Sequence, residues 1–131
     1  MESNQIHQYD YACNQMNQID GIRFAAIINN KGRKIAGGFS PNVTPLENDQ
    51  QKIEMLFMEL ALDLSMRKEF DNTLGNIAAI VSYRNKTNII TIPHQDNFML
   101  ISSEPELESS KIIQIGNENL RPMKIIQVMN C

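Results

Sequence analysis

One stretch of this sequence, from Thr44 to Phe70, predicts a long helix with two separate apolar faces. At about 100° per residue, the two faces lie on opposite sides of the helix. One carries Ile53, Leu56, Phe57, Leu60 and Leu64, and the other carries Met55, Met58, Leu62 and Met66. A helix on the surface of a single domain needs only one apolar stripe, which faces its own core. The fold must therefore provide a cover for each of the two stripes.

Local signals define the two ends of this helix. Thr44-Pro45-Leu46-Glu47 has the form of a capping box with proline at the first helical position, which predicts that the helix begins there. Arg67 and Lys68 favour the last turn, because their charges complement the negative end of the helix dipole. The residues from Asp71 to Gly75 are typical of a helix end.

The segments around this helix alternate between helical and strand patterns. Short apolar runs bounded by turn residues predict strands at 22–28, 33–39, 77–83, 88–92 and 98–101. Helical spacing predicts a first helix over residues 5–18 and a last helix from Pro105 to Gly116-Asn117. Because several strands are apolar on both faces, helices must cover both sides of the sheet. We therefore predict an α+β fold, a three-layer α/β/α sandwich with a five-stranded, mainly antiparallel sheet in the order α-β-β-α-β-β-β-α.

The C-terminal end of the chain carries an apolar segment that the predicted sandwich does not include. We expect one domain over residues 1–117, followed by an apolar tail over 118–131 that is too short to fold alone. An added strand and a segment that crosses to a neighbouring subunit are both compatible with its composition. The sequence does not distinguish between them.

Composition narrows the class of protein. With 131 residues, 42% of them hydrophobic and 21% charged, the chain has the composition of one folded soluble domain. A net charge of -3 with scattered basic residues argues against a nucleic-acid partner. No apolar run approaches the roughly 20 residues that span a bilayer, so we expect no membrane insertion. Two cysteines and no apolar leader predict a cytoplasmic protein.

Candidate catalytic and metal-binding groups are weak. The sequence has no glycine-rich phosphate loop, and a metal pair of His94 and Asp96 would offer too few ligands. Cys13 has no base at a spacing that would activate it. The acidic residues Glu104, Glu106 and Glu108 are explained more simply by a helix start. We therefore predict no enzyme activity, no cofactor, no metal and no catalytic residue.

Four segments in this order resemble the Roadblock/LC7 family, whose relatives have longin and profilin-like folds. Ile19-Asp20-Gly21-Ile22 leads into the first strand, and Asn30-Lys31-Gly32 forms its turn. Leu74-Gly75-Asn76-Ile77 opens the third strand, and Asn97-Phe98-Met99-Leu100-Ile101-Ser102-Ser103 forms the fifth strand. The resemblance spans about residues 6–117.

This resemblance implies a non-enzymatic homodimer in which the long helices meet and the third strands pair edge to edge. Such dimers serve as platforms that bind or regulate small Ras-like GTPases, or that anchor larger assemblies. The predicted dimer or partner interface consists of Met55, Met58, Leu62, Met66, Ile77, Ala79, Val81 and Tyr83. Two alternatives stay open: the methionine stripe can pack beneath the first helix or the tail of its own chain, or the protein can be a profilin- or PAS-like domain that senses a small molecule between sheet and helix.

Overall fold

The computed structural model describes the backbone of residues 3–129 and the side chains of residues 4–122. Its helices are α1 (Ser3–Asn17), α2 (Gln50–Arg67), α3 (Asp71–Leu74) and α4 (Ser109–Met129), with a short 3-10 turn, η1, over Lys68–Phe70. Its strands are β1 (Ile22–Ile28), β2 (Lys34–Phe39), β3 (Ile80–Tyr83), β4 (Asn88–His94) and β5 (Asn97–Ser103). The strands form one antiparallel sheet in the spatial order β2-β1-β5-β4-β3.

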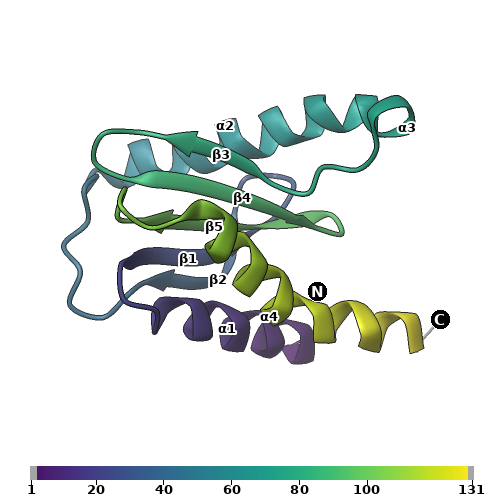
Figure 1. Cartoon of the computed structure of the whole chain (residues 1–131), viewed down its shortest axis with the longest axis horizontal. Coiled ribbons are helices and arrows are strands. Elements are labelled where there is room, and N and C mark those ends of the chain that lie inside the picture. Colours follow the sequence, from purple (N-terminus) through teal and green to yellow (C-terminus); the bar gives the residue numbers. More distant parts are fainter. Residues whose placement is uncertain (1–2, 130–131) are drawn as a thin grey trace.

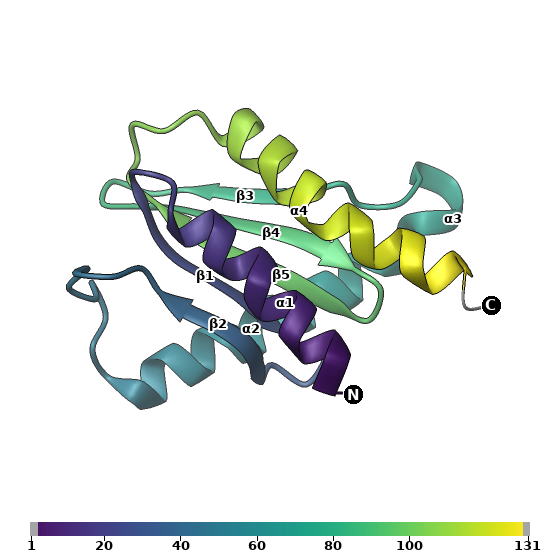
Figure 2. The same ribbon diagram turned by 90° about the horizontal axis from the view of Figure 1, so that it is seen from below.

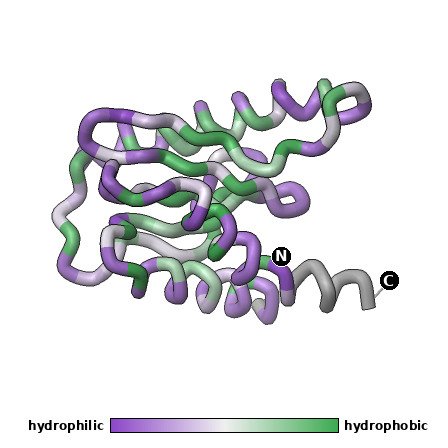
Figure 3. Tube along the Cα trace, in the orientation of Figure 1, coloured by the Kyte–Doolittle hydropathy of each residue, from purple (hydrophilic) through white to green (hydrophobic). Residues whose placement is uncertain are grey.

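The sheet is covered on both faces, which confirms the predicted α+β sandwich. Helix α2 lies along one face, and α1 and α4 lie across the other (Figures 1 and 2). In Figure 3, hydrophobic residues gather along the strands, and hydrophilic residues gather in the turns at the ends of the sheet. The central strands therefore separate two apolar cores.

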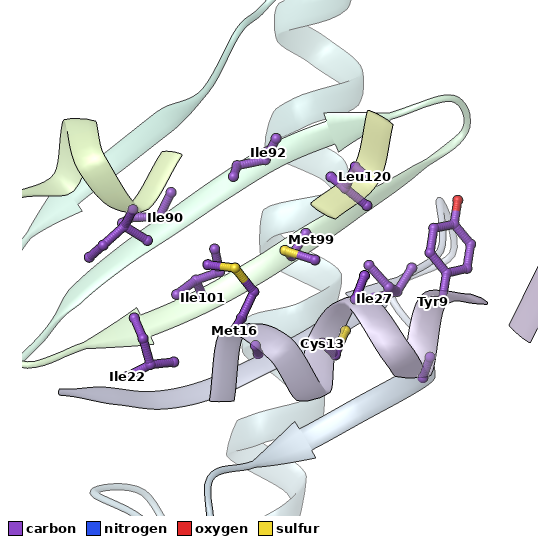
Figure 4. Close-up of a cluster of buried hydrophobic side chains, with 14 residues drawn as sticks. Tyr9, Cys13, Met16, Ile22, Ile27, Ile90, Ile92, Met99, Ile101 and Leu120 are labelled. Carbon is purple, nitrogen blue, oxygen red and sulfur yellow. The ribbon is translucent and has the colours of Figure 1, made fainter. Parts of the chain in front are cut away.

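Strand β1 shows why both cores form. Its alternate residues Phe24, Ala26 and Ile28 pack toward α2, where they meet Phe57, Ala61 and Leu64. Ala25 and Ile27 point the other way, into the larger cluster beneath α1 and α4. Figure 4 shows this second cluster, with Tyr9, Cys13 and Met16 of α1 facing Ile92, Met99 and Ile101 of the sheet. All of these residues in the second cluster are almost completely buried.

The predicted start of the long helix is wrong. Helix α2 begins at Gln50, and its N-cap is Asp49, whose carboxylate accepts a hydrogen bond of 3.0 Å from the Gln51 amide. Thr44 lies in the preceding loop, where its carbonyl oxygen accepts a hydrogen bond of 2.6 Å from the Arg23 guanidinium. The tertiary contact holds Thr44 outside the helix, and Asp49 offers an equally good cap. At the other end, η1 and α3 continue the chain in helical turns as far as Leu74.

The third strand is shorter than predicted, because β3 pairs with β4 only from Ile80 to Tyr83. In the same register, residue 78 would lie opposite Pro93, which has no N–H to donate to the ladder. Ile77 and Ala79 therefore precede the strand. One assignment on α2 also changes, since Leu56, predicted to face the sheet, is 39% exposed.

The last helix neither begins at Pro105 nor ends at Gly116-Asn117. It runs from Ser109 to Met129 and passes through Pro122. The helix packs closely on the sheet at Gly116, where a Cβ would come within 2.6 Å of the Ile92 Cδ1 atom. Leu120, one turn later, is fully buried and anchors the continuation. Residues 118–129 thus form no added strand, while the side chains after Pro122 and residues 130–131 lie outside the described part; the domain division after residue 117 stays a prediction.

Candidate interaction surface

The outer side of α2 carries an exposed apolar face, which we call the methionine face. Its members are Met55, Met58, Leu62 and Met66, with 57%, 61%, 62% and 57% of their surfaces exposed. Both α1 and α4 pack on the opposite face of the sheet (Figure 1). The alternative in which this stripe packs beneath the first helix is therefore wrong.

The buried side of α2 fixes the orientation of the methionine face. Phe57, Ala61 and Leu64 anchor the helix on the sheet, so the residues on its other side must point outward. The β1–β2 turn adds a second anchor, because Gly32 packs directly against the helix backbone. A Cβ on Gly32 would lie 2.7 Å from the Cα of Met58. The methionine face is therefore held on a rigid support.

Strand β3 lies at one edge of the sheet, on the side where the chain returns from α2 (Figure 1). Tyr83, predicted to be in the interface, is 70% exposed, and its hydroxyl lies 2.6 Å from the Ser109 Oγ. The other predicted residues of this region are half-buried. Ile77 packs against the α2-side core, and Ala79 and Val81 pack against the α1-side core. The structure thus exposes the edge mainly through its backbone and Tyr83.

The two edges of the sheet differ in how their backbone groups are used. At β2, the Gly37 amide donates to the Asp10 carboxylate at 2.8 Å, and the Asn17 amide nitrogen donates to the Gly38 carbonyl at 3.0 Å. Side chains of α1 thus occupy part of this edge. In the part of the chain that the structure describes, no side chain bonds to the backbone of β3. Edge β3 is therefore the one open to pairing with another strand.

Sequence reasoning missed two exposed residues beyond α2. Phe70 is 57% exposed and Leu74 is 80% exposed, in η1 and α3. The signal for them was present, because Met66, Phe70 and Leu74 recur every four residues. The sequence pattern places them at the helix end and predicts no partner surface there. Both lie in the helical turns between α2 and the segment that enters β3.

The candidate metal residue His94 belongs to a buried hydrogen-bond network. The Tyr9 hydroxyl lies 2.7 Å from His94 Nδ1 and accepts a hydrogen bond of 3.2 Å from the Asn97 side chain. The rings of Tyr9 and His94 meet edge to face, with centroids 5.5 Å apart. His94 is 1% exposed, whereas Asp96 lies exposed on the following turn. The network joins α1 to the β4–β5 hairpin and supports the fold.

Tyr9→Phe should destabilise the protein by about 1–2 kcal/mol, because Asn97 and His94 both lose a buried partner. Burial raises the pKa of the Tyr9 hydroxyl, so the group is a neutral hydrogen-bonding partner at pH 7. Urea unfolding monitored by circular dichroism measures the change. Tyr11→Phe, at an exposed position of the same helix, is the matched control and should change stability by less than about 0.5 kcal/mol. Equal effects of the two substitutions would contradict a structural role for the network.

The described residues offer neither a metal cluster nor a membrane-spanning helix. Among the residues that the structure describes, no three His, Cys, Asp or Glu side chains gather closely enough to hold a metal ion. Over the same residues, none of the helices combines the length and apolar character needed to cross a membrane.

Comparisons with known families and solved structures show which proteins this chain resembles. A family model described as a family of unknown function (DUF6659) matches residues 1–120. The chain belongs to this family. No curated protein sequence matches the chain.

Solved structures resemble this DUF6659 chain closely in fold and weakly in sequence. The gliding protein MglB from Thermus thermophilus superposes with a TM-score of 0.73 at 11% identity, covering 91% of this chain and 87% of MglB. MglB from Myxococcus xanthus superposes with a TM-score of 0.72 at 10% identity, and the match covers 98% of this chain and 94% of that MglB. A Roadblock/LC7 domain from Streptomyces avermitilis superposes with a TM-score of 0.67 at 10% identity, and the match covers 88% of this chain and 97% of that domain. These likenesses confirm the Roadblock/LC7 fold that the sequence predicted.

Proposed function

We propose that this chain is a non-enzymatic scaffold that forms a homodimer through α2 and β3. In this arrangement the methionine faces of two copies meet, and their β3 edges pair into one continuous sheet. One observation carries the proposal: four exposed apolar side chains lie on the helix that precedes β3, the sheet edge to whose backbone no described side chain bonds. A second copy offers both surfaces that this one needs, because a two-fold interface is self-complementary.

The energetics favour a partner for this face. Burying a fully exposed Met or Leu side chain contributes about 1.5–3 kcal/mol, so each of these roughly 60%-exposed side chains contributes about 1–2 kcal/mol when it is covered. Summed over two copies, the gain is of the same order as the roughly 4–15 kcal/mol that association costs. Strand pairing at β3 and burial of the exposed Phe70 and Leu74 would then supply the additional free energy by which the gain exceeds the cost of association.

The proposed partner of the dimer is a small Ras-like GTPase or a larger assembly. The support is the Roadblock/LC7 resemblance, together with the likeness to MglB, a gliding protein. Two adjoining α2 helices would form a broad platform with a rigid backbone. Size-exclusion chromatography of the purified protein mixed with a Ras-like GTPase from its host tests this step. Co-elution that depends on whether the GTPase carries a GTP analogue or GDP is expected, and no co-elution in either state would contradict it.

Light scattering of the purified protein tests the dimer itself. The wild-type chain should have about twice the monomer mass of 14.9 kDa at 50 μM, and Leu62→Glu should give the monomer mass, because two carboxylates would be buried against each other. Leu46→Glu makes the same chemical change at a 55%-exposed position in the loop before α2 and should remain dimeric. A monomeric wild type, or equal disruption by both substitutions, would rule out the methionine face as the dimer surface.

A further inference from the structure

A concave surface lies between α2 and the β1–β2 hairpin, at the opposite side of the sheet from the β3 edge. It encloses about 510 Å³, within the roughly 300–1,000 Å³ typical of small-molecule sites. Its walls are the first half of α2 on one side and β2 with its preceding turn on the other. We call it the hairpin groove. It lies between sheet and helix, where the sequence suggested that a small-molecule sensor would bind its ligand.

The floor of the hairpin groove is aromatic. Phe24 from β1 lies at its centre, with its ring centroid 4.9 Å from Phe39 of β2 and 6.0 Å from Phe57 of α2. Phe24 and Phe57 are buried, but Phe39 is 45% exposed. The ring of Phe39 is therefore held in place by Phe24 and still presents an apolar surface to solvent.

The rim of the groove is basic. Lys31, Arg33 and Lys34 line it, and Glu54 is its single acidic lining residue. None of the three basic side chains forms an ion pair in the described part of the chain. Because the whole chain has a net charge of -3, this concentration of positive charge is a local feature. It favours a ligand group of negative charge.

The rim is also held in place. The Asn29 side chain accepts hydrogen bonds of 3.0 Å from the backbone amides of both Lys31 and Arg33, which fixes the turn. Between them, Gly32 packs against the α2 backbone. A binding site with a fixed backbone loses less entropy when it takes a ligand.

Lys34 reaches the edge of the groove. Its Nζ atom lies 3.7 Å from the position of a Cβ built on Gly38, and both residues line the groove. Arg33 and Lys34 thus place two positive charges on the β2 side of the groove.

From this geometry we propose that the hairpin groove binds a small amphipathic anion. Its apolar body, aromatic or branched aliphatic, would lie on Phe24, Phe39 and Phe57, and its carboxylate would bind Lys34 and Arg33. This inference goes beyond the scaffold function. Of the methionine face, only Met58 lines the groove, so the two proposals rest on different surfaces.

A titration with a matched pair of ligands tests the proposal. 2-Naphthoate and 2-naphthalenemethanol have the same ring system and differ in the anionic group. In ¹⁵N–¹H NMR spectra, 2-naphthoate should cause saturable shifts of the Gly32, Gly38 and Phe39 amides, and the alcohol should bind at least about tenfold more weakly, since it forms no charge-assisted hydrogen bond. Equal affinities, or shifts that map to another surface, would overturn the proposal.

Two variants separate the rim from the floor. Arg33→Ala/Lys34→Ala should weaken 2-naphthoate binding about tenfold or more and leave the alcohol nearly unchanged. The control Arg84→Ala/Lys86→Ala removes the same two charges from the exposed β3–β4 turn and should have no effect. Phe39→Ala, which removes the 45%-exposed ring of the floor, should weaken the binding of both ligands about fivefold, because the apolar body loses an aromatic contact. Unchanged binding in either groove variant would refute the site, whereas the mass from light scattering tests the dimer independently.

Discussion

Gly32→Ala should lower the free energy of unfolding by about 3 kcal/mol. Gly32 has a φ of +78°, a conformation that costs an L-residue about 1–2 kcal/mol. In addition, the new Cβ would lie 2.7 Å from the Met58 Cα and 3.0 Å from the Met58 backbone nitrogen. A helix backbone cannot move aside as a flexible side-chain end can, and forced overpacking typically costs a further 1–3 kcal/mol or so.

Gly75→Ala is the control for backbone strain without a new contact. Gly75 has a φ of +87° and a ψ of 167°, a conformation that costs an L-residue about 1–3 kcal/mol, and nothing lies within 4 Å of a Cβ built there. Gly75→Ala should therefore lower stability and leave the backbone amide resonance of Met58 unchanged, whereas Gly32→Ala should lower stability and shift that resonance. Urea unfolding at one fixed protomer concentration and ¹⁵N–¹H NMR spectra give the comparison. An unchanged Met58 resonance in Gly32→Ala would show that the turn does not press on α2 in solution.

The same contact links stability to the proposed assembly. The β1–β2 turn supports α2 at Met58, which is also a member of the methionine face. If Gly32→Ala displaces α2, the exposed side chains no longer lie in one plane beside β3. The dissociation constant of the dimer should therefore rise in Gly32→Ala and stay close to the wild-type value in Leu46→Glu, which changes an exposed residue of the loop before α2.

The layered fold could be predicted because its strands carry an unambiguous pattern. Strands β1 and β5 are apolar on both faces, and this pattern requires cover from both sides whatever the connections are. The order of helices and strands along the chain was then compatible with only a few ways of arranging them in layers. Local signals were less reliable. The capping box at Thr44 was overridden by a hydrogen bond from Arg23, and Gly116, interpreted as a helix end, is a site of close packing on Ile92.

The candidate surface was also predictable only in part, because some of its features depend on contacts between residues that are distant in the chain. Helical periodicity alone placed the methionine face, because an exposed face and a buried face of one helix differ by angle. The contrast between the two sheet edges was beyond sequence reasoning. It depends on Asp10 and Asn17 reaching backbone groups of Gly37 and Gly38, which are distant in the chain. The hairpin groove likewise exists only once α2 lies across the hairpin.

Cys13→Ala should reverse its effect on stability as the pH rises. Cys13 lies fully buried on α1 (Figure 4), and burial, with a smaller contribution from the charge of Asp10, raises the pKa of its thiol to about 12. At pH 8 the thiol is protonated in the folded chain and mostly protonated in the unfolded chain. There the variant should be about 1 kcal/mol less stable than the wild type, because it loses buried contacts of the sulfur.

Between pH 9 and pH 12 the unfolded wild-type chain ionises Cys13, while the folded chain keeps the thiol protonated. The unfolded state alone is then stabilised, so the wild type loses stability as the pH rises through this window, by about 2–3 kcal/mol at pH 11. The variant has no thiol at position 13 and lacks this loss. It should therefore become the more stable protein by pH 11, as measured by urea unfolding under a reducing agent. A constant difference between the two proteins from pH 8 to pH 11 would mean that the thiol is not desolvated, and that α1 does not seal this core.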